Sequence, residues 1–190
     1  MGKIKIAIFA SGKGSNAINL ISFFKNHNLI EVSFVLSNKA DAPVLNSVKK
    51  IGLETKYYNK NKIEDGEFLT QVCKTAEIDW IILAGYLKLI PPKVVSTYKD
   101  KIINVHPSLL PKYGGKGMYG LNVHKEVLKN KEKESGITIH FVNEQFDKGR
   151  IIAQFYFEIN PKDNLLEIER KIKQLEQKYL PIVIEKSILQ

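Results

Sequence analysis

The sequence lacks the features that mark secreted and membrane-spanning proteins. Its 190 residues include one cysteine, Cys73, so an internal disulfide bond is excluded. No apolar run approaches the roughly 20 residues that a membrane-spanning helix needs. The N-terminus has no signal-peptide layout, because Lys3 and Lys5 alternate with apolar residues. These absences predict a cytoplasmic protein with no membrane partner.

Two common cofactor signatures are also absent. No cluster of Cys and His has metal-ligand spacing, so we predict no bound metal. The stretch "ASGKGSN", residues 10–16, lacks the Gly-Lys-Ser/Thr ending of an ATP-binding loop and the third glycine of a dinucleotide-binding turn. A phosphate monoester therefore suits this turn better than NAD or ATP does. The alternative is a tight turn that binds nothing.

Acidic residues are fewer than basic ones, 20 against 29, and the formal net charge is +9. Such a balance suits a nucleic-acid partner when the basic residues form a patch. Here the lysines are scattered through nearly every segment, with few aromatic residues among them. We therefore predict no nucleic-acid partner. A basic protein also suits an anionic small substrate.

Apolar runs alternate with helical patterns over the first 106 residues. Strands are expected at residues 3–10, 30–37, 53–58, 79–85 and 101–106, with helices at 17–27, 44–51 and 64–77. Ser15 is the expected N-cap of the first helix. Strands separated by helices indicate a parallel sheet, and continuous apolar runs indicate that both of its faces are covered.

The last third of the chain has a different pattern. Strands are expected at residues 136–142 and 151–159, and the eight residues between them leave no room for a helix, so they should pair antiparallel. Residues 164–188 form one or two helices bent near Pro181. The sequence thus predicts one α/β domain, residues 1–190. Its sheet is doubly wound, Rossmann-like and mostly parallel, with helices on both faces and an antiparallel C-terminal strand pair.

Polar side chains follow the fifth expected strand in "INVHPSLLP". Asn104 and His106 are two residues apart, so both point to the same side of the strand, at the end where parallel sheets bind ligands. An amide beside an imidazole suits stabilisation of an oxyanion. Asp147 in "FDKGR" could orient His106 or relay a proton. The alternatives are a structural histidine and a turn-forming aspartate. His124 and His140 have no polar residue at the same spacing beside them, so the sequence alone indicates a structural or supporting role for each.

Five segments together carry a family resemblance: "ASGKGSN", "SNKADAP", "LAGYLKLI", "INVHPSLLPKYGG" and "HFVNEQFDKGRII". In this order the chain resembles the folate-dependent formyltransferases, and among them the phosphoribosylglycinamide formyltransferases, over nearly its whole length. The resemblance implies transfer of the formyl group of 10-formyltetrahydrofolate to the amine of glycinamide ribonucleotide (GAR) in purine biosynthesis. These two small molecules are the implied partners. The oligomeric state, monomer or homodimer, stays open.

The resemblance also implies roles for individual residues. The catalytic set is Asn104, His106 and Asp147. Protonated His106 and the Asn104 amide would stabilise the oxyanion, and Asp147 would keep His106 charged. The GAR-binding set is Gly14, Ser15 and Asn16 at the phosphate, and Glu176 at the amine end. The folate-binding set is Leu87, Lys88, Leu89, Ile90, Asn104 and His140.

Some segments depart from the family pattern. The segment between Tyr113 and His124 is longer than usual and contains "GGKGMYGLN". Within it we expect Gly114 to Gly120 to form a mobile flap over the substrate cleft. Methionyl-tRNA formyltransferase and formyltetrahydrofolate hydrolase share the Asn-x-His-Pro segment, but each carries an extra domain that this sequence lacks. A non-catalytic RNA-binding module is the alternative from a different class, and it leaves Asn104, His106 and Asp147 unexplained.

Overall fold

The computed structural model describes residues 2–190, which fall into two compact units. Unit 1 ends at Ile103 and unit 2 begins at Asn104. The division falls within the strand β5 (Ile102–His106), so that strand contributes residues to both units. Whether the chain folds as one domain stays a prediction.

Unit 1 contains a parallel sheet built from apolar segments. Its strands are β1 (Ile4–Phe9), β2 (Ile30–Ser37), β3 (Glu54–Tyr57) and β4 (Trp80–Leu83). β1 pairs in parallel with β2 and β4, and β2 pairs in parallel with β3. The last four residues of β1 are buried, because helices cover both faces of the sheet. The predicted parallel sheet is confirmed.

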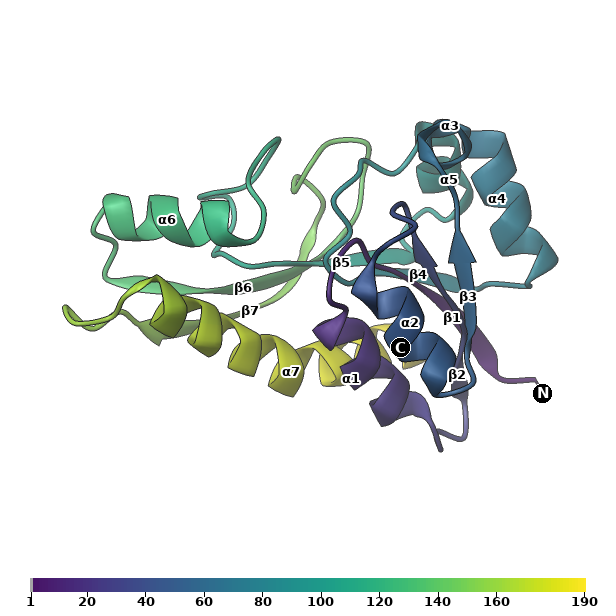
Figure 1. The fold of residues 1–190 in the computed structure, drawn as a ribbon, viewed down its shortest axis with the longest axis horizontal. Coiled ribbons are helices and arrows are strands. Elements are labelled where there is room, and N and C mark those ends of the chain that lie inside the picture. Colours follow the sequence, from purple (N-terminus) through teal and green to yellow (C-terminus); the bar gives the residue numbers. More distant parts are fainter. Residues whose placement is uncertain (1) are drawn as a thin grey trace. The chain divides into compact units, whose positions relative to one another are not determined.

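The helices of unit 1 lie on both sides of this sheet (Figure 1). They are α1 (Ser15–Phe24), α2 (Pro43–Lys50), α3 (Lys60–Glu64), α4 (Gly66–Thr75) and α5 (Pro92–Thr97). The helix predicted at 64–77 is α4, which starts where the Asp65 side chain accepts the Phe68 N–H, whereas the short helix α3 before it was not predicted. The predicted N-cap was also wrong. Gly14, in the left-handed region, is the N-cap of α1, and Ser15 is its first helical residue.

Unit 2 contains the antiparallel strand pair. Its elements after β5 are α6 (Leu121–Lys129), β6 (Glu134–Phe141), β7 (Ile151–Glu158) and α7 (Leu165–Leu189). β6 pairs antiparallel with β7, as predicted. Within residues 2–190 the strands form one seven-stranded sheet in the order β3-β2-β1-β4-β5-β6-β7. The fold class is therefore α/β with a mostly parallel sheet and an antiparallel C-terminal pair, as the sequence predicts.

The C-terminal segment is one helix of 25 residues. The Asn164 side chain caps it by accepting the N–H groups of Leu166 and Glu167. Pro181 lies inside the helix and is buried, so α7 continues through it where the sequence left one or two helices open. α7 packs against β6, and with α6 it encloses apolar residues of unit 2.

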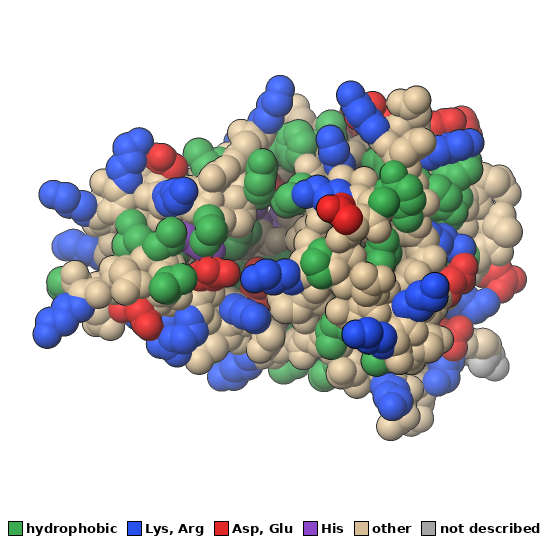
Figure 2. All heavy atoms as spheres, viewed as in Figure 1, with side chains coloured by type: hydrophobic (Ala, Val, Ile, Leu, Met, Phe, Trp, Pro, Cys, Tyr) green, Lys and Arg blue, Asp and Glu red, His purple; other side chains and the backbone are tan. Residues whose placement is uncertain are grey.

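The face of the molecule seen in Figure 2 shows no large segregation of charge. Lys and Arg side chains are spread over the visible face of each unit in Figure 2. Across residues 2–190, none of the helices combines the length and the apolar character needed to cross a membrane.

Candidate active site

The end of β5 carries two polar side chains, Asn104 and His106, on a regular strand. Ile102 and Ile103 are buried, which anchors the strand, and Asn104 and His106 follow at alternate positions. His106 is only 3% exposed. Because alternate residues of a strand share a side, the amide and the imidazole point the same way.

Asp147 reaches this place from the connection between β6 and β7. Its backbone lies in the left-handed region, with φ 54°, which non-glycine residues rarely adopt. Gly149 permits the turn, because a Cβ there would overlap the carbonyl of Phe141. The Asp147 Oδ2 atom accepts the Gly115 N–H at 2.9 Å. A strained residue held by specific contacts is typical of a functional position.

Three side chains converge on one carboxylate oxygen of Asp147. Asp147 Oδ1 lies 3.5 Å from Asn104 Nδ2 and 3.5 Å from His106 Nδ1. It also lies 3.7 Å from His140 Nε2. The Asn104 amide nitrogen lies 3.1 Å from His140 Nε2. The fold thus brings together Asn104, His106, His140 and Asp147, all in unit 2. The gaps around Oδ1 are slightly long for hydrogen bonds, as is common in unliganded sites.

Backbone carbonyls fix the orientation of both imidazoles. His140 Nδ1 lies 2.8 Å from its neighbour's carbonyl, on Phe141, and donates to it, so Nε2 is free to accept the Asn104 amide. His106 Nε2 donates to the carbonyl of Tyr113 at 2.8 Å. The Nδ1 atom of His106 is therefore the one that faces Asp147.

Burial changes the expected charge of His106. Desolvation lowers the pKa of His106 below its ordinary value, although Asp147 and the Tyr113 carbonyl both raise it. In the unliganded protein the influence of burial on the pKa of His106 thus runs against the charge that the sequence assigns to it, while Asp147 acts in the expected direction. Burial also acts to raise the pKa of Asp147, but the interactions with His140 and His106 and the hydrogen bond from the Gly115 amide together lower it. The site thus pairs an ionised carboxylate with a neutral imidazole near neutral pH.

A buried hydroxyl that the sequence did not single out fixes the loop after His106. Thr138 Oγ1, on β6, donates to the carbonyl of Ser108 at 2.7 Å and accepts the Leu110 N–H at 2.9 Å. It also accepts the Gln154 amide at 2.9 Å. Thr138 is two residues before His140, so the alternation of β6 was the only available signal.

The glycine-rich turn of unit 1 is tightly packed. Gly14 has φ 76°, and a Cβ there would collide with the side chain of Val44. Ser11 is 2% exposed and its hydroxyl donates to Asn38 Oδ1 at 2.6 Å. α1 has no acidic residue in its first turn and no side-chain cap among the described residues. This helix start therefore favours an anion.

The predicted folate segment lies beside that turn within unit 1. The Leu87 N–H donates to Ser11 Oγ at 3.0 Å, and the Ser11 N–H donates to the Gly85 carbonyl at 3.0 Å. Leu87 and Leu89 are 37% and 40% exposed, whereas Ile90 is buried. Residues 87–90 form no helix or strand, so their backbone is irregular.

The remaining predicted residues lie elsewhere. Ser15 and Asn16 begin α1, Lys88 is exposed, and Glu176 is half-buried in the middle of α7. Their predicted binding roles stay predictions. Among residues 2–190, no group of three or more His, Cys, Asp or Glu side chains is gathered so that it could hold a metal ion.

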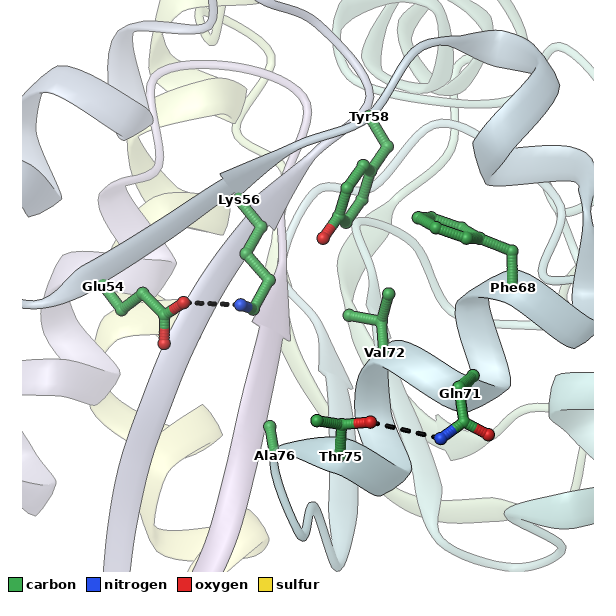
Figure 3. Close-up of a pocket in the computed structure, with 8 residues that line it drawn as sticks. All are labelled: Glu54, Lys56, Tyr58, Phe68, Gln71, Val72, Thr75 and Ala76. Carbon is green, nitrogen blue, oxygen red and sulfur yellow. Dashed lines mark hydrogen bonds and ion pairs between the residues drawn. The ribbon is translucent and has the colours of Figure 1, made fainter.

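A groove in unit 1 contains none of the predicted residues. It has a volume of about 410 Å³ and lies between β3 and α4 (Figure 3). Apart from Tyr58, its polar side chains are paired with each other: Lys56 Nζ contacts Glu54 at 2.5 Å, and Gln71 Nε2 donates to Thr75 at 3.2 Å. The groove therefore offers a ligand few unused polar groups.

The protein is an α/β enzyme with a mostly parallel sheet, in which the fifth strand ends in an Asn-x-His pair beside a half-buried carboxylate. The chain belongs to the formyl transferase family, which it matches over residues 4–184. The resemblance expected from the sequence is therefore confirmed.

Proteins from several organisms are similar to this chain in sequence and in fold. The chain is 37% identical over 186 residues to phosphoribosylglycinamide formyltransferase, chloroplastic, from Arabidopsis thaliana, covering 94% of this chain but only 64% of that protein. It is 35% identical to phosphoribosylglycinamide formyltransferase from Bacillus subtilis, covering 97% of this chain and 94% of the relative. The crystal structure of phosphoribosylglycinamide formyltransferase from Bacillus halodurans superposes with a TM-score of 0.86 at 33% identity, covering 96% and 94% of the two chains.

Proposed function

We propose that the protein transfers the formyl group of 10-formyltetrahydrofolate to the amine of GAR, as a step of purine biosynthesis in the cytoplasm. The convergence of Asn104, His106 and His140 on Asp147 Oδ1 carries this proposal, because it supplies both an amide donor and a proton acceptor. Its family membership and the names of its relatives point to the same reaction.

The chemistry follows from the charges of the site. The GAR amine attacks the formyl carbon and a C–N bond forms, so the formyl oxygen becomes an oxyanion and the amine becomes an ammonium. The Asn104 amide donates to that oxyanion. Neutral His106 takes the ammonium proton at Nδ1, and ionised Asp147 stabilises the imidazolium. The bond to N10 of the folate then breaks, and the same proton passes to N10.

The binding roles extend the proposal in each unit. In unit 1, residues Gly14, Ser15 and Asn16 bind the GAR phosphate at the start of α1, and residues 87–90 contact the folate. Because the Leu87 N–H is already donated to Ser11, we assign the folate contact to the exposed Lys88 and its following neighbours. In unit 2, Asn104 and His140 contact the folate. Glu176 binds the amine end of GAR.

Formyl transfer can be tested directly. The protein is incubated with 10-formyltetrahydrofolate and GAR, and release of the deformylated folate is followed. We expect release that depends on GAR. Alanine in place of Asn104, His106 or Asp147 should lower turnover by about 10²-fold to 10⁴-fold, while the circular dichroism spectrum stays unchanged.

The controls separate this reaction from its rivals. Lys129→Ala, on the exposed face of α6, should keep the wild-type rate. Release of tetrahydrofolate without GAR would indicate a hydrolase. Formyl transfer to methionyl-tRNA in place of GAR would indicate the tRNA enzyme. Full activity of His106→Ala would contradict the proposed mechanism.

A further inference from the structure

The segment from Lys112 to Gly115 contacts both catalytic groups through its backbone. The Tyr113 carbonyl accepts the proton of His106 Nε2 at 2.8 Å. The Gly115 N–H donates to Asp147 Oδ2 at 2.9 Å. One short turn therefore sets the ring nitrogen that carries a proton and the orientation of the carboxylate that faces the ring.

This turn is strained and closely packed. Tyr113 has φ 58° and Gly115 has φ 102°, both in the left-handed region. A non-glycine residue there costs about 1–3 kcal/mol, so Tyr113 needs contacts that hold it. Between them, a Cβ at Gly114 would lie 2.6 Å from a methyl of Leu110 and 3.2 Å from the Asp147 Cβ. The turn has little room to shift without moving Asp147.

The Glu132 carboxylate makes the principal contact with the Tyr113 hydroxyl, beside a side-chain hydrogen bond with Asn130. The Ser108 hydroxyl also donates to the Lys112 carbonyl at 2.8 Å. The Tyr113 hydroxyl donates to Glu132 Oε1 at 2.8 Å. Lys112 Nζ contacts the same carboxylate at 3.0 Å and 3.2 Å. The Glu132 side chain is 23% exposed and that of Lys112 is 67% exposed. An exposed lysine contributes little, so the hydroxyl bond is the stronger tether.

We propose that Glu132 is a positioning residue for the reaction. Through the Tyr113 hydroxyl it holds the strained turn whose carbonyl keeps the His106 proton on Nε2, and so keeps Nδ1 open toward Asp147 and the reacting amine. The Glu132 carboxylate contacts the Tyr113 hydroxyl and the Lys112 ammonium, not His106 or Asp147, so it acts through Tyr113. The assignment rests on the proposed formyl transfer, in which His106 Nδ1 accepts the proton.

Loss of the tether has a specific consequence for His106. Without it the turn can relax, and the Tyr113 carbonyl moves away from Nε2. The proton of neutral His106 is then no longer fixed on Nε2, and a contact that raises the pKa of His106 is lost. A shift of even about 1 Å in a catalytic group can cost about 100-fold in rate. A purely structural role for Glu132 would change stability without changing the tautomer.

The experiment compares Glu132→Ala, Tyr113→Phe and the double variant with wild type. We expect each single variant to lower kcat between about tenfold and 100-fold with little change in KM. The double variant should be no worse than either single one, because both remove the same contact. The acid limb of the kcat profile should move to lower pH. Glu132→Gln keeps a carbonyl that accepts the hydroxyl, so it should recover most of the lost rate.

A measurement without substrate separates this inference from the proposed function. In ¹⁵N NMR spectra of the free protein, wild-type His106 should show its proton on Nε2, and Glu132→Ala should show a mixture of tautomers. Glu167→Ala is the matched control, since Glu167 pairs with Arg170 at 2.9 Å on α7. It should leave both the spectrum and the rate unchanged. An unchanged tautomer and pH profile in Glu132→Ala would overturn the positioning role, whether or not wild type transfers formyl groups.

Discussion

At the scale of single residues, His106 is defined by opposing influences on its charge. Burial favours the neutral ring, whereas Asp147 and the Tyr113 carbonyl favour the charged ring. Burial is the largest of these influences, so the ring is neutral in the free protein and can accept a proton. A general base works best when its pKa is close to the working pH. Asp147 and the Tyr113 carbonyl limit the fall in the pKa of His106, so the ring stays basic enough to accept a proton.

Asp147→Asn tests this balance. The substitution removes the negative charge that raises the pKa of His106, so that pKa should fall below the wild-type value. Turnover should drop by about 10²-fold or more, because the imidazolium loses its stabilising partner. The pKa is read from the pH dependence of the His106 ring signals in NMR spectra. A higher pKa in the variant would mean that Asp147 does not act on His106 by its charge.

Cys73 offers a second test at this scale. It is fully buried in α4, and burial raises the pKa of its thiol to about 12. Because the thiolate is the reactive form, the native protein at pH 8 should react with a disulfide reagent only through unfolding. The rate is followed by absorbance, and the same protein in urea should react at once. Fast reaction of the native protein would contradict the burial.

At the scale of elements, the start of α1 depends on a glycine. Gly14 has a left-handed backbone and contacts Val44 so closely that no Cβ fits. Gly12, two residues earlier in the same turn, has open space around it. The two positions therefore separate the effect of losing a glycine from the effect of disturbing the helix start.

Gly14→Ala should destabilise the protein by about 2 kcal/mol, since it adds both backbone strain and a collision. It should also raise the KM for GAR, because the amides at the start of α1 move away from the phosphate. Gly12→Ala should leave stability and KM close to wild type. Urea unfolding and steady-state kinetics measure the two effects. Equal behaviour of both variants would show that this turn has no special role.

The elements also show what a sequence can predict. Strands β1, β2, β4 and β5 were predicted because apolar residues dominate each of these short segments. α6 was missed, because it follows a glycine-rich stretch and begins without a side-chain cap. The five-residue helix α3 was missed because its sequence, Lys60–Glu64, has a single buried apolar residue, Ile63.

The site was predictable only in part for a related reason. Asn104 and His106 share a strand, so their common direction follows from local geometry. The contact between Asn104 and His140 joins residues 36 positions apart, and only the pairing of the sheet brings them together. The neutral state of His106 depends on burial, which a motif does not report. The Tyr113 turn was equally hidden, because its contacts run through the backbone.

At the scale of the whole molecule, buried histidines link stability to pH. Burial lowers the pKa of both His106 and His124 in the folded protein, although Glu169 acts to raise that of His124. Such groups bind fewer protons in the folded state than in the unfolded state. Stability therefore rises with pH across the window that extends downward from the ordinary pKa of 6.5.

The expected result is a lower free energy of unfolding at pH 5.5 than at pH 7.5, measured by urea titration. Asp147 has a lowered pKa below its ordinary 3.8, so its own contribution is lost only at more acid pH. His124→Gln removes one of the two groups and should flatten the slope. A slope that is the same in wild type and His124→Gln would show that His124 does not titrate with unfolding.

The division of the chain within β5 affects which properties of the protein a substitution in each unit can alter. Every residue of the proton-transfer cluster, from Asn104 onward, belongs to unit 2, whereas the turn at residues 11–16 belongs to unit 1. On the proposed function, the two units carry separate tasks: one performs the chemistry and the other holds the phosphate of the acceptor. Substitutions in the first hundred residues can therefore change which acceptor the protein binds, while the proton-transfer residues of unit 2 stay the same.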